Sequence, residues 1–131
     1  MKVRDLSGKE HLWNPHKSLG LRRLNASQLH INAVNFLRDI YPAAQLLEEV
    51  YIPGEDLYID IYIPSLKTAV ECQGSQHGKH NKFFHGPTSK GFKKSLDRDQ
   101  RKRDWCELNS IRIVYFYPEE SEEQWKVKML S

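Results

Sequence analysis

The chain has 131 residues, of which 39% are hydrophobic and 28% charged, and its formal net charge is +3. This length fits one domain, the composition excludes an intrinsically disordered chain, and no apolar run is long enough to span a bilayer. The N-terminus lacks the apolar stretch of a signal peptide, and two cysteines are too few for a disulfide framework. We therefore expect a cytoplasmic protein with no membrane partner.

The predicted elements follow one another as helix, three strands, helix, strand and helix. Residues 1–24 show no clean period and are expected to form a basic arm or irregular lead-in. Helices are expected over 25–41, from about 90 or 95 to 109, and over 119–129, and strands over 46–52, 57–63, 67–73 and 111–116. Asn25 or Ser27 can cap the first helix.

This order of elements predicts a single domain over 1–131, with a core over 25–116 and a C-terminal helix within 117–131. A helix, an antiparallel meander and a helical crossover into a last strand give an α/β fold. Its mixed central sheet has about four strands, with helices on its faces.

Basic residues gather in two segments. Residues 1–23 carry a net charge of +4, and residues 74–103 hold nine Lys or Arg against two Asp, a net charge of +7. Acidic residues collect elsewhere, at Glu48, Glu49, Glu55, Asp56 and within 119–123. A basic flank beside an acidic pair is typical of a nuclease, in which the cations bind phosphates. The alternative is a solvated Lys/Arg surface.

Two carboxylates lie on neighbouring predicted strands, Asp60 on the first and Glu71 on the second. If these strands pair as a hairpin, the two carboxylates converge near one end of the sheet. Two acids in mostly apolar strands are costly unless they hold a cation, and their hard oxygen ligands suit Mg²⁺ or Mn²⁺. The alternatives are an outward-facing Asp60 on an edge strand and a buried Glu71 that pairs with a helix Arg or Lys.

Two further polar residues follow Glu71 closely. Gln73 can orient a water or the scissile phosphate, or it can be a solvent-facing strand end. His77 lies just past the strand, where it can activate water or protonate the leaving oxygen, or be an ordinary loop histidine.

Three motifs in order carry a resemblance to a known family. They are Asp60-Ile-Tyr-Ile-Pro, then Glu71-Cys-Gln73-Gly-Ser-Gln-His77, then Asp99-Gln-Arg-Lys102 on the predicted helix. Together, over about residues 25–116, they resemble the PD-(D/E)xK nuclease superfamily, in its branch of very-short-patch-repair-like and phage-type homing endonucleases.

The resemblance implies a restriction-endonuclease-like fold and a catalytic set of Asp60, Glu71, Gln73, His77 and Asp99. Asp60 and Glu71 would hold the metal, His77 would move a proton, and Asp99 would point toward His77 or the metal. Gln73 stands where the family has a lysine. Gln28 or His30 stands where the first helix of the family offers an early Glu. No Cys-x-x-Cys pair is present, so we expect no structural zinc.

The function that follows is a Mg²⁺- or Mn²⁺-dependent endonuclease, of the kind that phages encode, that nicks double-stranded DNA or cuts both strands. The side chains expected to bind the nucleic acid are Lys79, Lys82, Lys90, Lys93, Lys94, Arg98, Arg101, Lys102 and Arg103. Asp99 and Lys102 can instead form an ordinary surface pair.

Specificity would come from the 1–24 arm, the 74–92 loop, a homodimer partner or an accessory protein. The alternative function is a weak or inactive nucleic-acid-binding module that keeps the nuclease fold. A structural domain without a nucleic acid partner is the third.

Overall fold

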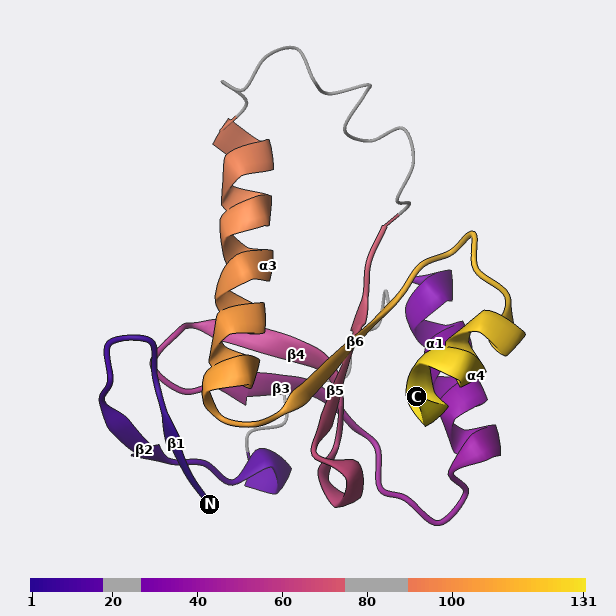
Figure 1. Ribbon diagram of the computed structural model, residues 1–131, viewed down its shortest axis with the longest axis horizontal. Coiled ribbons are helices and arrows are strands. Elements are labelled where there is room, and N and C mark those ends of the chain that lie inside the picture. The colour runs from indigo at the N-terminus through magenta and orange to yellow at the C-terminus, as the bar shows by residue number, and fades with distance from the viewer. Residues whose placement is uncertain (18–26, 75–89) are drawn as a thin grey trace.

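The computed structural model describes residues 1–17, 27–74 and 90–131; for residues 17 and 90–96 only the backbone is described. Within these ranges a mixed sheet has the strand order β3-β4-β5-β6, with β5 and β6 parallel and the other pairs antiparallel. The helix α3 lies on one face, and α1 and α4 lie on the other (Figure 1). The predicted mixed α/β sheet with helices on its faces is therefore confirmed.

The elements keep close to their predicted bounds in the central part of the chain. Their bounds are β1 (Lys2–Arg4), β2 (Glu10–Leu12), η1 (Pro15–Lys17), α1 (Gln28–Ile40), β3 (Leu47–Ile52), β4 (Leu57–Ile63), η2 (Pro64–Leu66), β5 (Thr68–Cys72), α3 (Lys90–Leu108), β6 (Arg112–Phe116) and α4 (Glu122–Leu130). Of the two cap candidates for α1, Ser27 is the cap, because its side chain accepts a hydrogen bond from the His30 N–H. None of the described helices has the length and apolar character needed to cross a membrane.

Aromatic side chains hold α1 and α4 against their face of the sheet. The Phe116 and Trp125 rings stack with centroids 4.5 Å apart, and Phe36 meets both edge-on. Ser121 and Gln124 form a capping box that starts α4. The buried side of α1 and the C-terminal helix thus share one apolar cluster with β6.

The first seventeen residues differ from the irregular lead-in that the sequence predicts. The strands β1 and β2 pair as an antiparallel hairpin, and Val3 and Trp13 are buried. The Trp13 ring packs against Tyr62 and Trp105, at 5.0 and 5.2 Å between centroids. Strands of three residues are too short to show an alternating pattern, so this hairpin depends on tertiary packing.

A polar clamp joins the hairpin, the β3–β4 turn and α3. The buried Glu55 carboxylate accepts a hydrogen bond from the Leu6 N–H at 2.7 Å and another from Arg101 Nη2 at 3.3 Å. Arg101 Nη2 also donates to the Glu55 carbonyl at 2.6 Å. These contacts hold α3 beside the sheet end that carries the polar residues described next.

Candidate functional site

Asp60 and Glu71 lie opposite one another on β4 and β5, as the sequence predicts. The antiparallel register pairs Ile61 with Val70, so the next pair along is Asp60 with Glu71. The Asp60 N–H donates to Glu71 Oε2 at 2.8 Å, and the Cys72 N–H donates to Asp60 Oδ2 at 2.8 Å. Each carboxylate therefore binds the backbone of the opposite strand, just beyond the Ile61–Val70 pair of the β4–β5 ladder.

Lys102 reaches this pair from α3. Its Nζ lies 2.7 Å from Glu71 Oε1, and the two side chains are 16% and 2% exposed, respectively. The alternative of a buried Glu71 paired with a helix cation is thus the observed geometry. Lys102 takes part in the acidic centre itself, so it is more than a surface contact for phosphate.

The electrostatics of the three groups follow from their burial. Burial raises the pKa of Glu71 to about 7, and the nearby Asp60 charge adds to this effect, while Lys102 opposes it. Burial by itself lowers the pKa of Lys102, but the charge and hydrogen bond of Glu71, with the Asp60 charge, outweigh it and raise that pKa. A protonated lysine therefore stands beside a carboxyl group that gives up its proton near neutral pH.

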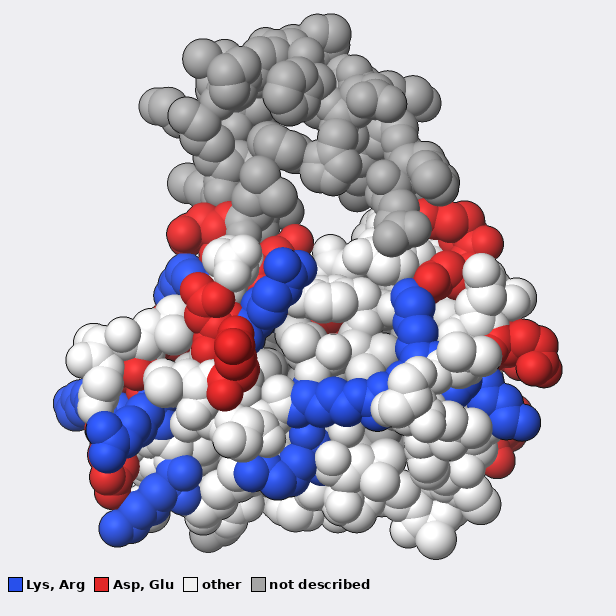
Figure 2. Space-filling view, viewed as in Figure 1, with Lys and Arg blue, Asp and Glu red and all other residues white. Residues whose placement is uncertain are grey.

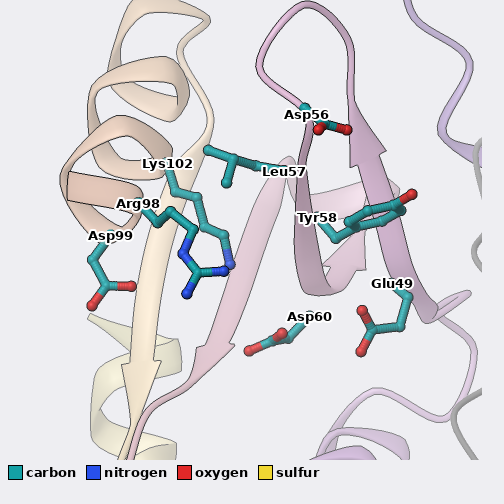
Figure 3. Close-up of a pocket in the computed structure, with 8 residues that line it drawn as sticks. All are labelled: Glu49, Asp56, Leu57, Tyr58, Asp60, Arg98, Asp99 and Lys102. Carbon is teal, nitrogen blue, oxygen red and sulfur yellow. The ribbon is translucent and has the colours of Figure 1, made fainter. Parts of the chain in front are cut away.

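A cavity of about 390 Å³ opens beside these groups. Figure 3 shows that one wall comes from α3 and the other from β3, β4 and the turn between them. Arg98 and Lys102 extend from the helix toward Asp60, and Tyr58 lies on the far side. The lining residues are Glu49, Asp56, Leu57, Tyr58, Asp60, Arg98, Asp99 and Lys102.

Glu49 is a pocket residue that the sequence analysis did not select. The register that pairs Glu48 with Ile61 places Glu49 opposite Asp60, so Glu49, Asp60 and Glu71 form a row across three strands. Glu49 is 7% exposed and has a φ of 53°, in the left-handed region that non-glycine residues seldom occupy. Such backbone conformations gather at functional sites.

Acidic residues that lie outside the basic segments of the sequence thus come close to the acidic pair in the fold. Glu49 and Asp56 line the pocket, and Glu55 belongs to the clamp that holds α3. The turn between β3 and β4 sets the register that places Glu49 opposite Asp60. The turn between β4 and β5 sets the register that places Asp60 opposite Glu71. These two turns, which can be recognised in the sequence, therefore already indicated that Glu49 lies beside the acidic pair.

The other predicted catalytic residues fall in different places. Asp99 lines the pocket on the helix side. Gln73 follows β5, where its N–H donates to the Phe116 carbonyl at 2.9 Å, and it is not among the lining residues. His77 lies outside the described residues.

The first helix does not bring its candidates to the pocket. Gln28 is exposed and donates to Asn32, one turn along the helix. His30 is buried, and its Nε2 lies 2.7 Å from Glu48 Oε1. Neither side chain lines the cavity, so neither replaces the early Glu at this site.

The basic side chains expected to bind nucleic acid also lie in different places. Arg98 and Lys102 line the pocket, whereas Arg101 binds Glu55 and Arg103 donates to the Tyr115 hydroxyl at 3.3 Å. Of the remaining cations, Lys79 and Lys82 lie outside the described residues. The backbone alone is described for Lys90, Lys93 and Lys94.

The donor atoms at Asp60 and Glu71 fit a hard divalent cation. Among the residues that the structure describes, no group of three or more His, Cys, Asp or Glu side chains is arranged to hold a metal ion. Mg²⁺ does not require such a group, because it keeps several waters and binds through one or two carboxylates with substrate phosphates. Burial and the Asp60 charge disfavour the ionised form of Glu71, and a bound metal cation would offset this cost.

Comparisons with known proteins find viral relatives. The chain is 38% identical over 61 residues to uncharacterized protein 094L of Frog virus 3 (isolate Goorha), which covers 47% of this chain and 39% of the relative. It is 37% identical over 59 residues to uncharacterized protein 307L of Invertebrate iridescent virus 6, which covers 45% of this chain and 29% of the relative. A third match, to uncharacterized protein 033L of Invertebrate iridescent virus 3, is 33% identical over 63 residues, 48% of this chain and 32% of that protein.

The matched part spans about a third of the length of these relatives. The names of these relatives state no activity. No family model matches the chain, and no solved structure matches it.

Proposed function

We propose that this protein is a metal-dependent endonuclease that hydrolyses DNA phosphodiester bonds on a restriction-endonuclease-like fold. The observation that carries the proposal is the convergence of Asp60, Glu71 and Lys102, with Lys102 Nζ 2.7 Å from Glu71 Oε1, beside a pocket. Two acids and a lysine are the groups that the resemblance requires, and Lys102 on α3 would take the place of the family lysine that Gln73 replaces.

The residues divide the chemistry among them. Asp60 and Glu71 would hold Mg²⁺ or Mn²⁺, which when bound stabilises charge on a phosphoryl oxygen and lowers the pKa of water. Lys102 keeps its proton and stabilises negative charge that develops beside Glu71. Arg98, on the same wall of the pocket, binds a flanking phosphate.

A second candidate function is a nucleic-acid-binding module with little or no turnover. The observation that favours it is the hydrogen bonding of the acids, because both Glu71 oxygens and one Asp60 oxygen already accept bonds from the protein. A metal would have to share or displace these partners.

Nicking of a supercoiled plasmid in Mg²⁺ or Mn²⁺ tests the proposal. We expect nicking by the wild type, and a rate at least about 100-fold lower for Asp60→Ala and for Lys102→Met. Asp104→Asn is the matched control, because Asp104 is an exposed α3 acid that binds Gln100 away from the pocket, and it should nick normally.

Two outcomes would reject the enzyme. Tight DNA binding without nicking in either metal would favour the binding module. Equal nicking by wild type and Asp60→Ala would show that the activity comes from a contaminant.

A further inference from the structure

Tyr58 is the exposed member of an otherwise covered strand. Six of the seven β4 residues are buried or half-buried, but Tyr58 is 44% exposed. It stands two residues from Asp60, so both side chains leave the strand on the same face, and both line the pocket. The Tyr58 ring is therefore exposed to the cavity beside the acidic centre.

The ring is also held in position before any ligand arrives. Tyr51 on β3 meets it edge-on, with centroids 5.4 Å apart and an interplanar angle of 64°. Tyrosine has two rotatable side-chain bonds, so a ring fixed in this way loses little conformational entropy when a ligand stacks on it. Tyr58 is thus a preformed flat surface.

The α3 wall of the pocket, opposite Tyr58, carries positive charge. Arg98 and Lys102 extend from α3 toward Asp60, and Tyr58 lies on the far side of the pocket (Figure 3). Among the described residues Arg98 makes no ion pair within 4 Å. A ligand that satisfies both walls has a flat aromatic group at one end and a phosphate at the other, which is the chemistry of a nucleotide.

The pairing state of that nucleotide follows from the size of the pocket and the need for a free base. A volume of about 390 Å³ is near the lower end of small-ligand pockets and accommodates one nucleotide. In a duplex both faces of each base are covered by neighbouring bases, so stacking on Tyr58 requires a base that has left the stack. We infer that Tyr58 stacks on an unpaired base and that the substrate is single-stranded DNA or a duplex with an unpaired nucleotide. This inference rests on the proposed function.

Binding without turnover tests the inference. The full chain with Asp60→Asn, which blocks metal-assisted cleavage, is titrated into a fluorescently labelled short DNA single strand and into the blunt duplex of the same sequence. We expect the single strand to bind more tightly. Tyr58→Ala and Tyr58→Leu should weaken single-strand binding about tenfold, and Tyr58→Phe should not, because only the planar ring is needed.

The controls separate stacking from general effects. Leu12→Ala removes an apolar side chain that is 81% exposed and outside the pocket, and it should bind as its parent does. Leucine keeps the apolar volume at position 58, so Tyr58→Leu reports on stacking even if Tyr58→Ala folds poorly.

Three outcomes would overturn the inference: unchanged binding by Tyr58→Leu, an equal loss on single strand and duplex, or no binding of either the single strand or the same duplex with one unpaired nucleotide. Because turnover is not measured, Tyr58-dependent binding without cleavage of either the plasmid or the single strand by the wild type would reject the nuclease and leave only the binding to an unpaired base standing. Nicking that persists while Tyr58 proves unimportant would reject this inference alone.

Discussion

At the residue scale, Glu71 is a carboxyl group held almost entirely out of water. It is 1% exposed, accepts bonds from the Asp60 N–H and Lys102, and faces a second carboxylate. Its raised pKa is the result of burial and of the Asp60 charge. The site is therefore sensitive to protonation in the absence of a cation.

In EDTA, the free energy of unfolding should depend on pH because Glu71 titrates. The pKa of Glu71 is about 7 in the folded protein, against an ordinary value of 4.5, so between these pH values the folded state binds more protons. Stability should therefore fall as pH rises through this window, by about 3 kcal/mol, and level off above it. Urea unfolding of wild type and Glu71→Gln at a series of pH values measures the difference, and parallel curves would contradict the assignment.

Glu49 offers a test of stored backbone strain. Its φ of 53° suits glycine, and both Glu49→Gly and Glu49→Ala remove the carboxylate. We expect Glu49→Gly to be more stable than Glu49→Ala by about 1 kcal/mol, because alanine keeps the left-handed penalty. Thermal or urea unfolding of the two variants measures this difference, and equal stabilities would show that the strand is unstrained at Glu49.

At the element scale, α3 carries two arginines one turn apart that have different surroundings. Arg101 binds the Glu55 carbonyl and carboxylate and so holds the helix to the β3–β4 turn and the N-terminal hairpin. Arg98, one turn earlier, lines the pocket. The same residue type is thus a structural clamp at one position and a phosphate ligand candidate at the other.

Methionine substitutions should separate these two roles. Arg101→Met leaves the buried Glu55 carboxylate with one donor fewer, so we expect a loss of about 1–3 kcal/mol in the free energy of unfolding. Arg98→Met should change stability by less than about 0.5 kcal/mol and should weaken DNA binding. Urea unfolding and anisotropy on both variants check this, and a stable Arg101→Met that binds DNA poorly would assign Arg101 to the nucleic acid instead.

At the scale of the whole molecule, acidic and basic side chains are interspersed on the face of the described residues that Figure 2 shows. The net charge is only +3, so under the proposed function long-range attraction for DNA would be modest and the cations at the pocket would contribute most of the described contacts.

This distribution predicts a shallow salt dependence. We expect DNA affinity to fall with added salt, with a slope that corresponds to a few phosphate contacts, and Arg98→Met should reduce that slope by about one. Anisotropy titrations at several salt concentrations measure both slopes. Binding that does not change with salt would exclude a nucleic acid partner held by its phosphates.

Periodicity and turn residues determined the central fold from the sequence. The alternation in β4 and β5, Pro64 at the start of the turn between them, and the helical spacing of α1 are local, so their bounds and the pairing of Asp60 with Glu71 could be predicted. The hairpin of β1 and β2 could not, because each strand of three residues is stable only where Trp13 packs against the core.

The acidic pair and the basic helix that follows it are properties of the sequence by itself. Which basic residue joins that pair is not, since Arg98, Arg101, Lys102 and Arg103 have similar sequence context and differ only in the direction in which α3 points them. The tertiary structure pairs Lys102 with Glu71 and Arg101 with Glu55. It also brings Glu49, whose own backbone is left-handed, to the pocket. The physical reason is that rotation of a helix against a sheet is set by packing of the buried Trp105 and Cys106 side, which charge patterns do not encode.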